Sequence, residues 1–290
     1  MAYSVKTSAA LIDLHVHGAH THDTMTRRQD DILSIAEAHG RRGTGAIVPT
    51  IYPRPIELMR ESMNAVRRAM ASQRGGATIL GVHLEGPFLH PDRAGALDRK
   101  GFLDPSVSTL ASLIDGFEDI IRIMTIAPEL PGALKLIEIC REKGFLVQMG
   151  HSDASFEQAE EGKRAGATGI THLFNAMRGF HHREPGLAGF GLMDDDLYVE
   201  VIADMAHLHV QSLKMVLEMK RPERILLVSD SVKGPGWGKG PIRGPGGVLE
   251  GSGVSLMDCV KNLVSLGVHQ EWALQFASDN PRQYLGIKEP

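Results

Sequence analysis

The chain has 290 residues, and its 42% of hydrophobic residues are enough to bury a sizeable core within one large domain. The formal net charge is -4, which excludes a general basic field for nucleic acid or an anionic membrane and leaves anion recognition to local arginines or lysines. No stretch reaches membrane-spanning length and the first residues lack a signal peptide's long apolar run, so we expect a cytoplasmic protein.

Short apolar runs predict eight strands along the chain. They cover residues 10–16, 45–51, 78–84, 120–126, 144–150, 167–173, 198–204 and 224–230. Their richness in Val, Ile and Leu is typical of strands that are buried on both faces. Amphipathic segments separate most of them and predict helices within 27–43, 55–72, 105–117, 131–144, 155–166, 211–220 and 255–267. This alternation favours a single (β/α)₈ TIM barrel over residues 1–290 rather than a doubly wound open sheet.

Two connections interrupt the alternation. Residues 174–197 follow the sixth strand with only a weak helical pattern, and residues 233–253 follow the eighth and are dense in Gly and Pro. Both connections lead from a strand to a helix, and in a barrel such loops lie at the face where active sites are built. We interpret the second as a turn-rich flap, because it contains no phosphate-binding glycine motif in a strand–helix context.

Histidines and carboxylates mark the ends of five predicted strands. In the first strand His15 and His17 are two residues apart, so both imidazoles can reach one point. Any one such residue would more often be structural, but strand ends converge in a closed barrel. The whole set at these ends is His15, His17, Glu85, His151, His172 and Asp230. Imidazoles with a carboxylate are suitable ligands for zinc or another divalent first-row metal.

A metal with these ligands would make bound water acidic enough to give hydroxide at neutral pH. A neighbouring carboxylate can then take the proton from the water and pass it to a leaving amine. Asp230 is the natural candidate for this base. The pattern therefore predicts hydrolysis of an amide or ester-like bond.

Longer motifs carry a resemblance to a known family. They are LIDLHVHGAHTHDT, GVHLEGPFLHP, MGHSDAS, THLFNAMRGFHHREPGLAG, IADMAHLH, LLVSDS, LEGSGVSLMDCVKNLV and ASDNPRQYLG, in this order between residues 11 and 286. The chain resembles the N-acetylglucosamine-6-phosphate deacetylases of the amidohydrolase superfamily. THLFNAM with REPGLAG is the most specific part of the resemblance, whereas HVHG alone would indicate only the superfamily.

The resemblance implies a role for each site residue. Glu85, His151 and His172 would bind the principal metal, and His15 and His17 a second metal that some members have lost. Asp230 would be the general base and acid. The substrate would be an amino-sugar phosphate, contacted by Asn175, Ala176 and His207, with its phosphate bound by Arg183. Zinc is the expected metal, as one or two ions, with iron or another first-row metal as the alternative. Relatives are commonly homodimers that complete the phosphate site across the interface.

Three features depart from the family pattern. Leu97 stands where the family has a histidine that polarises the acetyl carbonyl, and leucine cannot donate a hydrogen bond to an oxyanion. Either the metal alone polarises the carbonyl, or His90 substitutes, or the substrate differs. The small β-sandwich that family members build from both chain ends is expected to be absent. The Gly/Pro-rich loop at 233–247, with Trp237, predicts a different lid.

Three functions remain open at this point. The first is metal-dependent hydrolysis of N-acetylglucosamine-6-phosphate to glucosamine-6-phosphate and acetate. The second is an amidohydrolase for a different N-acyl or cyclic amide substrate, which Leu97 and the unusual loop favour. The third is a catalytically inactive metal-binding barrel, since a fold does not by itself imply a function. The intact set of metal ligands and Asp230 favours an enzyme.

Overall fold

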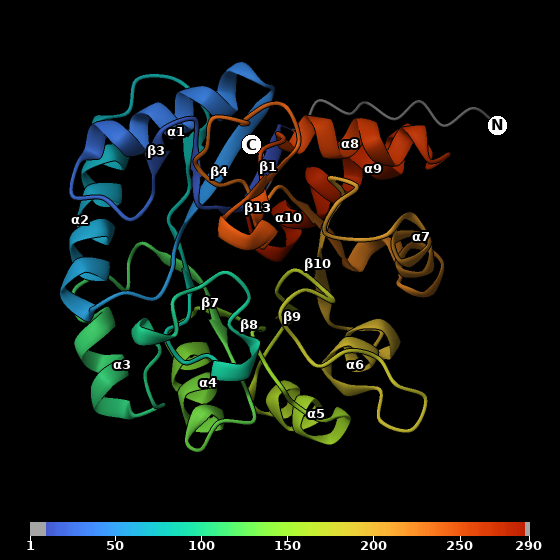
Figure 1. The fold of residues 1–290 in the computed structure, drawn as a ribbon. Helices are drawn as coiled ribbons and strands as arrows, with labels where there is room; N and C mark the ends of the chain where they lie inside the picture. The colour runs from blue at the N-terminus through green and yellow to red at the C-terminus, as the bar shows by residue number, and fades with distance from the viewer. Residues whose placement is uncertain (1–9, 288–290) are drawn as a thin grey trace.

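The computed structural model describes residues 10–287, which form a ring of parallel strands surrounded by helices (Figure 1). All eight predicted strands are present. In ring order they are β1 (Leu11–Val16), β4 (Thr44–Ile51), β6 (Val82–Glu85), β7 (Ile121–Ile126), β8 (Leu146–Met149), β9 (Gly169–Ile170), β10 (Tyr198–Ile202) and β11 (Ile225–Val228). The prediction of a (β/α)₈ barrel is confirmed.

The third strand is interrupted. β5 (Thr78–Ile79) pairs with β4, and β6 resumes the strand after Gly81, whose φ is +144°. A Cβ at Gly81 would lie 2.3 Å from the carbonyl oxygen of Ile120, so a side chain cannot be accommodated there. Glycine therefore lets the strand bend between its two halves.

The ring closes between its first and last strands. Val16 and Ser231 form a parallel bridge. The Asp230 amide donates to the His15 carbonyl at 3.0 Å, and the His17 amide donates to the Ser231 carbonyl at 2.8 Å. Because these bonds join the two ends of the ring, they bring residues more than 200 positions apart in sequence into contact. The closure thereby places Asp230 beside the histidines of β1.

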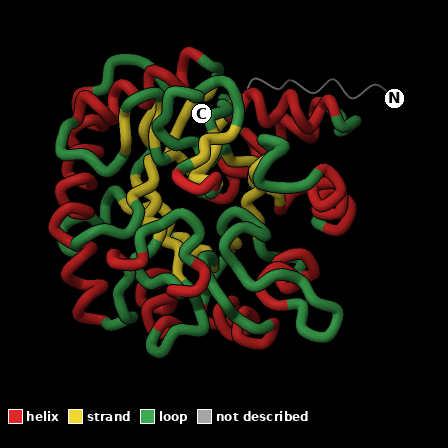
Figure 2. The backbone as a smooth tube through the Cα atoms, in the orientation of Figure 1, coloured by secondary structure: helices red, strands yellow, loops and turns green. Residues whose placement is uncertain are grey.

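Helices form the outer layer, red around the yellow strands in Figure 2. The seven predicted helices are α1 (Gln29–Arg41), α2 (Ile56–Ser72), α3 (Val107–Ile114), α4 (Ala133–Glu142), α5 (Phe156–Ala165), α7 (Val210–Met219) and α8 (Leu256–Ser265). Capping boxes begin two of them, with Ser155 and Gln158 at α5 and Ser255 and Asp258 at α8. Two further helices, α9 (Gln270–Ala277) and α10 (Asp279–Tyr284), follow α8. Short 3₁₀ turns cover Pro91–Arg93, Arg99–Gly101, Pro222–Arg224 and Pro245–Gly247.

The connection 174–197 contains one helix that the periodicity did not predict, α6 (Gly186–Met193). Every residue of α6 except Met193 is buried. A helix buried on all sides has no polar face, so its sequence carries no amphipathic period. This explains why its pattern was weak.

The predicted flap at 233–253 contains a two-stranded hairpin, β12 (Pro241–Arg243) and β13 (Leu249–Ser252). The Ser252 amide donates to the Asp230 carbonyl at 2.8 Å, which fixes β13 beside the closing strand. Trp237 is only 7% exposed and lies against the rings of His20 and His39. A second small hairpin, β2 (Gly18–Ala19) with β3 (His22–Asp23), follows β1. The flap is thus anchored at both its base and its tryptophan.

The core has two parts. A large apolar layer lies between strands and helices, and a smaller cluster fills the barrel interior. The inner cluster comprises Ile12, Leu14, Ala46, Val48, Ile123, Ile202, Leu226, Val228 and Tyr284. Among the described residues no helix is both long and apolar enough to cross a membrane. The remaining open end of the barrel, where the strands finish, carries the polar residues considered next.

Candidate metal centre and active site

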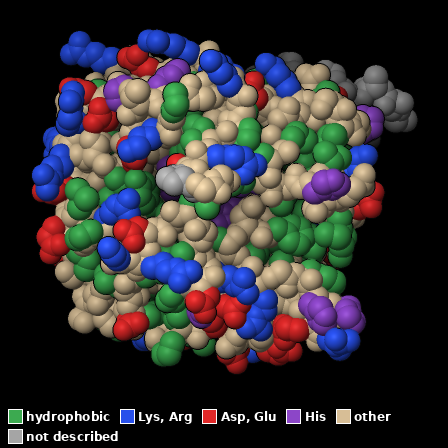
Figure 3. Space-filling view, viewed as in Figure 1, with side chains coloured by type: hydrophobic (Ala, Val, Ile, Leu, Met, Phe, Trp, Pro, Cys, Tyr) green, Lys and Arg blue, Asp and Glu red, His purple; other side chains and the backbone are tan. Residues whose placement is uncertain are grey.

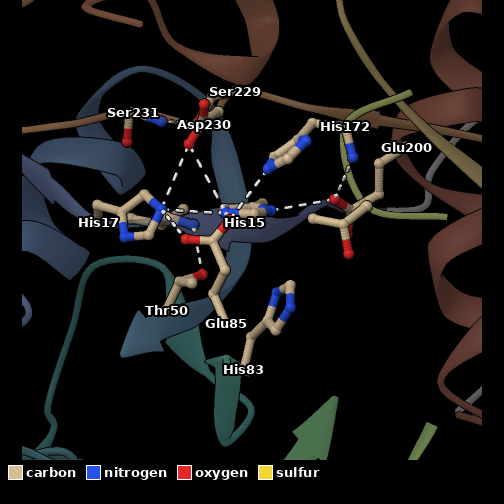
Figure 4. A network of polar contacts seen from close by, with 12 residues as sticks. His15, His17, Thr50, His83, Glu85, His172, Glu200, Ser229, Asp230 and Ser231 are labelled. Carbon is tan, nitrogen blue, oxygen red and sulfur yellow. Dashed lines mark hydrogen bonds and ion pairs between the residues drawn. The ribbon is translucent and has the colours of Figure 1, made fainter. Parts of the chain in front are cut away.

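The structure brings together all six polar residues predicted at the strand ends, and Figure 4 labels each of them except His151. The Glu85 carboxylate lies between the imidazoles. Its Oε1 is 3.1 Å from His151 Nε2 and 3.0 Å from His172 Nε2, and its Oε2 is 3.3 Å from His17 Nε2. Glu85, His151 and His172 are at most 5% exposed, and His17 is 9% exposed. The Glu85 carboxylate therefore joins histidines from three different strand ends.

These side chains form two groups that could each bind a metal ion. One group is Glu85, His151 and His172, and the other is His15, His17 and Asp230. In the second group the two Nε2 atoms are 3.0 Å apart, and Asp230 Oδ1 lies 3.4 Å from that of His17 and 3.7 Å from that of His15. A close, buried set of imidazole nitrogens and carboxylates is the ligand chemistry of zinc and related divalent ions. The residues present fit one or two such ions.

Three of these residues have an unusual backbone conformation. The φ angles are +47° at His151, +30° at His172 and +49° at Asp230. Non-glycine residues in this region cost about 1–3 kcal/mol each and persist where the surrounding structure holds them. Such strain is concentrated at functional sites. Here the positive φ angles direct three side chains inward at the point where their strands end.

Further groups fix the orientation of the histidines. His15 Nδ1 lies 3.0 Å from Glu200 Oε2, and His151 Nδ1 lies 2.8 Å from the Arg93 carbonyl oxygen. Burial would raise the pKa of Glu200, but the nearby His15 lowers it to about 2, so the carboxylate is ionised. Ionised or carbonyl partners of this kind set the tautomer and direction of a metal-binding imidazole. The sequence analysis missed Glu200, although a lone Glu within the apolar strand YVEVIAD could have indicated it.

Asp230 has a second histidine beside it. His207 Nε2 lies 3.7 Å from Asp230 Oδ2, and His207 Nδ1 lies 2.8 Å from Asp204 Oδ2. Burial lowers the pKa of His207, but the hydrogen bond to Asp204 and the negative charges of Asp230 and Asp204 together raise it above its ordinary value. A cationic imidazole is therefore favoured next to the Asp230 carboxylate. The contribution of Asp204, three residues before His207, was also missed from the sequence.

A cavity of about 150 Å³ opens directly above these groups, and we refer to it as the central cavity. Figure 3 shows this face of the molecule, which is hollowed near its middle with histidine visible inside. The predicted substrate residues Asn175, Ala176 and His207 line the cavity together with Glu85, His151, His172, His17 and Asp230. Gly95, Ala96, Leu97 and two flap residues, Leu249 and Glu250, complete its wall. Three of the four predicted substrate residues therefore lie at the candidate metal centre.

Arg183 is the exception. It is exposed on the connection before α6, its guanidinium lies 2.9 Å from His182 Nε2, and it does not line the central cavity. His90 does not line it either, and its Nδ1 accepts a hydrogen bond from the Asp92 amide. Leu97, in contrast, does border the cavity. The suggestion that His90 replaces the missing histidine is therefore not supported by its position.

The barrel and its cluster of histidines and carboxylates define a hydrolase of the metal-dependent type. A family model described as the amidohydrolase family matches residues 7–289. The N-acetylgalactosamine-6-phosphate deacetylase of Escherichia coli O157:H7 is 34% identical over 96% of this chain and 78% of the relative. The N-acetylglucosamine-6-phosphate deacetylase of Vibrio furnissii is 32% identical over 96% of this chain and 73% of the relative. The chain belongs to the amidohydrolase family, within its group of N-acetylglucosamine-6-phosphate deacetylases and their relatives.

Solved structures agree. The N-acetylglucosamine-6-phosphate deacetylase of Pasteurella multocida matches with a TM-score of 0.88 at 25% identity, over 96% of this chain and 76% of that chain. A point mutant of the Mycobacterium smegmatis enzyme, in complex with N-acetyl-D-glucosamine-6-phosphate, matches with a TM-score of 0.89 at 27% identity, over 96% of this chain and 77% of that chain. The family is metal-dependent, which fits the groups of possible metal ligands found here.

Proposed function

We propose that this protein hydrolyses the N-acetyl group of N-acetylglucosamine-6-phosphate to give glucosamine-6-phosphate and acetate. The observation that carries the proposal is a single cavity that joins Asp230 and both ligand groups to Asn175, Ala176 and His207. The named relatives act on the same class of amino-sugar phosphate. The whole barrel would be one domain, with the hydrolytic site at the ends of its strands.

Glu85, His151 and His172 would hold the principal metal, with His15 and His17 at a second position. A divalent ion, which we propose to be zinc, supplies a Lewis acid that polarises the amide carbonyl and lowers the pKa of water. Leu97 provides no hydrogen-bond donor in this wall of the cavity, so a bound metal would have to polarise the carbonyl without an oxyanion-binding side chain at this position.

Asp230 would take a proton from the attacking water and then give it to the leaving amine, as one residue acting first as base and then as acid. Its position supports this role, because the carboxylate borders both the histidines and the cavity. His207 Nε2 lies 3.7 Å from Asp230 Oδ2, and both residues line the central cavity. Asp204 keeps this imidazole in place through the bond to its Nδ1.

Arg183 remains our candidate for binding the phosphate. In one protomer it lies away from the cavity, so the contact would need either movement of its loop or a second copy of the chain. A homodimer is consequently part of the proposal. The cytoplasmic location stays a prediction from the sequence.

The proposal is tested by measuring free amine released from N-acetylglucosamine-6-phosphate after loading with zinc, iron or manganese. The galactosamine epimer is assayed alongside, because one of the similar relatives is named for it. The unphosphorylated sugar and an Arg183→Ala variant test whether the protein recognises the phosphate group of the substrate. We expect turnover of a phosphorylated sugar and a raised KM in the variant for that sugar alone. Metal-loaded protein that releases no amine from either phosphorylated sugar would refute the proposal.

A further inference from the structure

A second cavity, of about 250 Å³, adjoins the central cavity and is not used by the proposed reaction. It is lined by His17, Asp23, Tyr52, Arg54, Ala96, Leu97, Val232, Lys233 and Glu250. His17, Ala96, Leu97 and Glu250 border both cavities, so the two meet at the candidate metal centre. We call this second space the side cavity.

The two cavities share His17 among the candidate metal ligands, and the other ligands that border a cavity line the central cavity alone. Asn175, Ala176 and His207, the residues expected to contact the sugar, line the central cavity and not the side cavity. When an amide is cleaved at the metal, the sugar and the acyl group extend from the carbonyl in different directions. If the sugar occupies the central cavity, the side cavity is therefore the space that remains for the acyl group.

The side cavity is larger than an acetyl group requires. An acetyl group offers a single methyl beyond the carbonyl, whereas a water molecule has a share of about 30 Å³ in the liquid, so 250 Å³ admits a chain of several atoms. Leu97, at the junction of the two cavities, gives this passage an apolar wall suited to methylene groups. The volume leaves room for an acyl chain longer than acetyl.

The charges in the side cavity indicate what such a chain would carry at its end. Asp23 is already satisfied, since it accepts from Lys233 Nζ at 2.9 Å and from the Tyr52 hydroxyl at 3.1 Å. Arg54 is half-buried, and within residues 10–287 no carboxylate lies at salt-bridge distance from it. Its guanidinium lies over the Tyr52 ring at 5.0 Å and donates to the Pro53 carbonyl at 3.3 Å. These contacts position the cation and leave its other donors for a ligand.

We propose that the side cavity binds an acyl group that ends in a carboxylate, with Arg54 as the residue that recognises it. The inference rests on the proposed deacylase function and extends its substrate class to N-acyl amino-sugar phosphates of dicarboxylic acids. Water adds to the amide carbonyl and the C–N bond breaks. The products are the protonated amine and a dicarboxylate dianion, so the total charge is unchanged. Glu250, an exposed carboxylate at the junction of the two cavities, would repel the terminal carboxylate of the acyl group.

The test compares zinc-loaded protein on glucosamine-6-phosphate bearing N-acetyl, N-butyryl, N-malonyl, N-succinyl or N-glutaryl groups. The butyryl group matches the length of the succinyl chain without its charge. We expect the best dicarboxylic substrate to exceed N-butyryl by about tenfold or more in kcat/KM, the effect of one hydrogen bond to a charged group. Arg54→Gln should bring this ratio close to one, and Glu250→Gln should raise it. Arg164→Gln, which changes an exposed arginine on α5, is the matched control and should leave the ratio as in the parent.

Three results would overturn the inference, and they can be told apart from one another. Hydrolysis of the N-acetyl sugar with no preference for a dicarboxylic chain would show that the side cavity takes no part in the reaction. The proposed function would then remain intact. A raised KM of Arg54→Gln for the phosphorylated N-acetyl sugar, but not for the unphosphorylated one, would show that Arg54 reads the phosphate instead. Release of amine from none of these sugars would remove the proposed function and this inference together.

Discussion

The two ligand groups of the site are alike in composition but differ in how the fold supports them. Glu85, His151 and His172 come from three separate strand ends, and two of these residues have a strained positive φ. His15 and His17 come from one strand, and Asp230 reaches them only through closure of the ring. The first group is therefore assembled by parallel strands side by side, and the second by the joining of the chain's first and last strands.

Their supporting contacts differ as well. His15 is oriented by the carboxylate of Glu200, whereas His151 is oriented by the carbonyl of Arg93. Asp230 belongs to the second group but also faces His207, so its carboxylate could serve either as a metal ligand or as a proton acceptor. In the proposed mechanism the first group would hold the principal metal, whereas the second would share its carboxylate with proton transfer.

The largest effect is expected from Glu85, which contacts histidines of both groups. Glu85→Gln keeps the shape of the side chain but removes the negative charge that balances the positive charge of the metal. We therefore expect the variant to lose its bound metal and its activity to fall to background, which corresponds to a loss of several kcal/mol of transition-state stabilisation. Metal content by mass spectrometry, with amine release, checks both. Full metal occupancy in this variant would show that the first group does not depend on its carboxylate.

Asp230→Asn should separate proton transfer from metal binding. We expect kcat to fall by about 10²–10⁴, the usual contribution of a general acid–base group, while metal bound by Glu85, His151 and His172 is retained. Single-turnover kinetics beside metal analysis provide the measurement. If the variant loses all its metal, Asp230 is chiefly a ligand and the distinction between the groups fails.

Glu200→Gln should give the smallest of the three effects and act mainly on the second group, because Glu200 meets the side chain of His15 but only the backbone amide of His172. Removing an orienting partner of a ligand typically costs about 10–100-fold in metal affinity. Competition with a chromophoric chelator would measure this affinity for each bound ion, with Glu160→Gln on the surface of α5 as the control. A weakened ion at Glu85, His151 and His172, with the other ion unaffected, would contradict the assignment of Glu200 to His15.

Much of the fold and part of the site follow from local patterns. The eight strands and seven helices were predictable because apolar runs and helical periods depend on neighbouring residues. The six polar residues at the strand ends were predictable because parallel strands in a barrel finish at one face. The helix α6 could not be predicted in this way, since its burial on all sides leaves no period in the sequence.

The sequence by itself determined the barrel and the residues that face its open end, through spacing and residue type. Only the tertiary structure decided that Glu200 supports His15 and that Arg183 lies outside the cavity of its own protomer. It also decided that a second cavity, with Arg54 in its wall, opens beside the metal ligands. The reason is physical. These features depend on distances between segments far apart in the chain, and such distances are set only when the ring closes and its loops pack against one another.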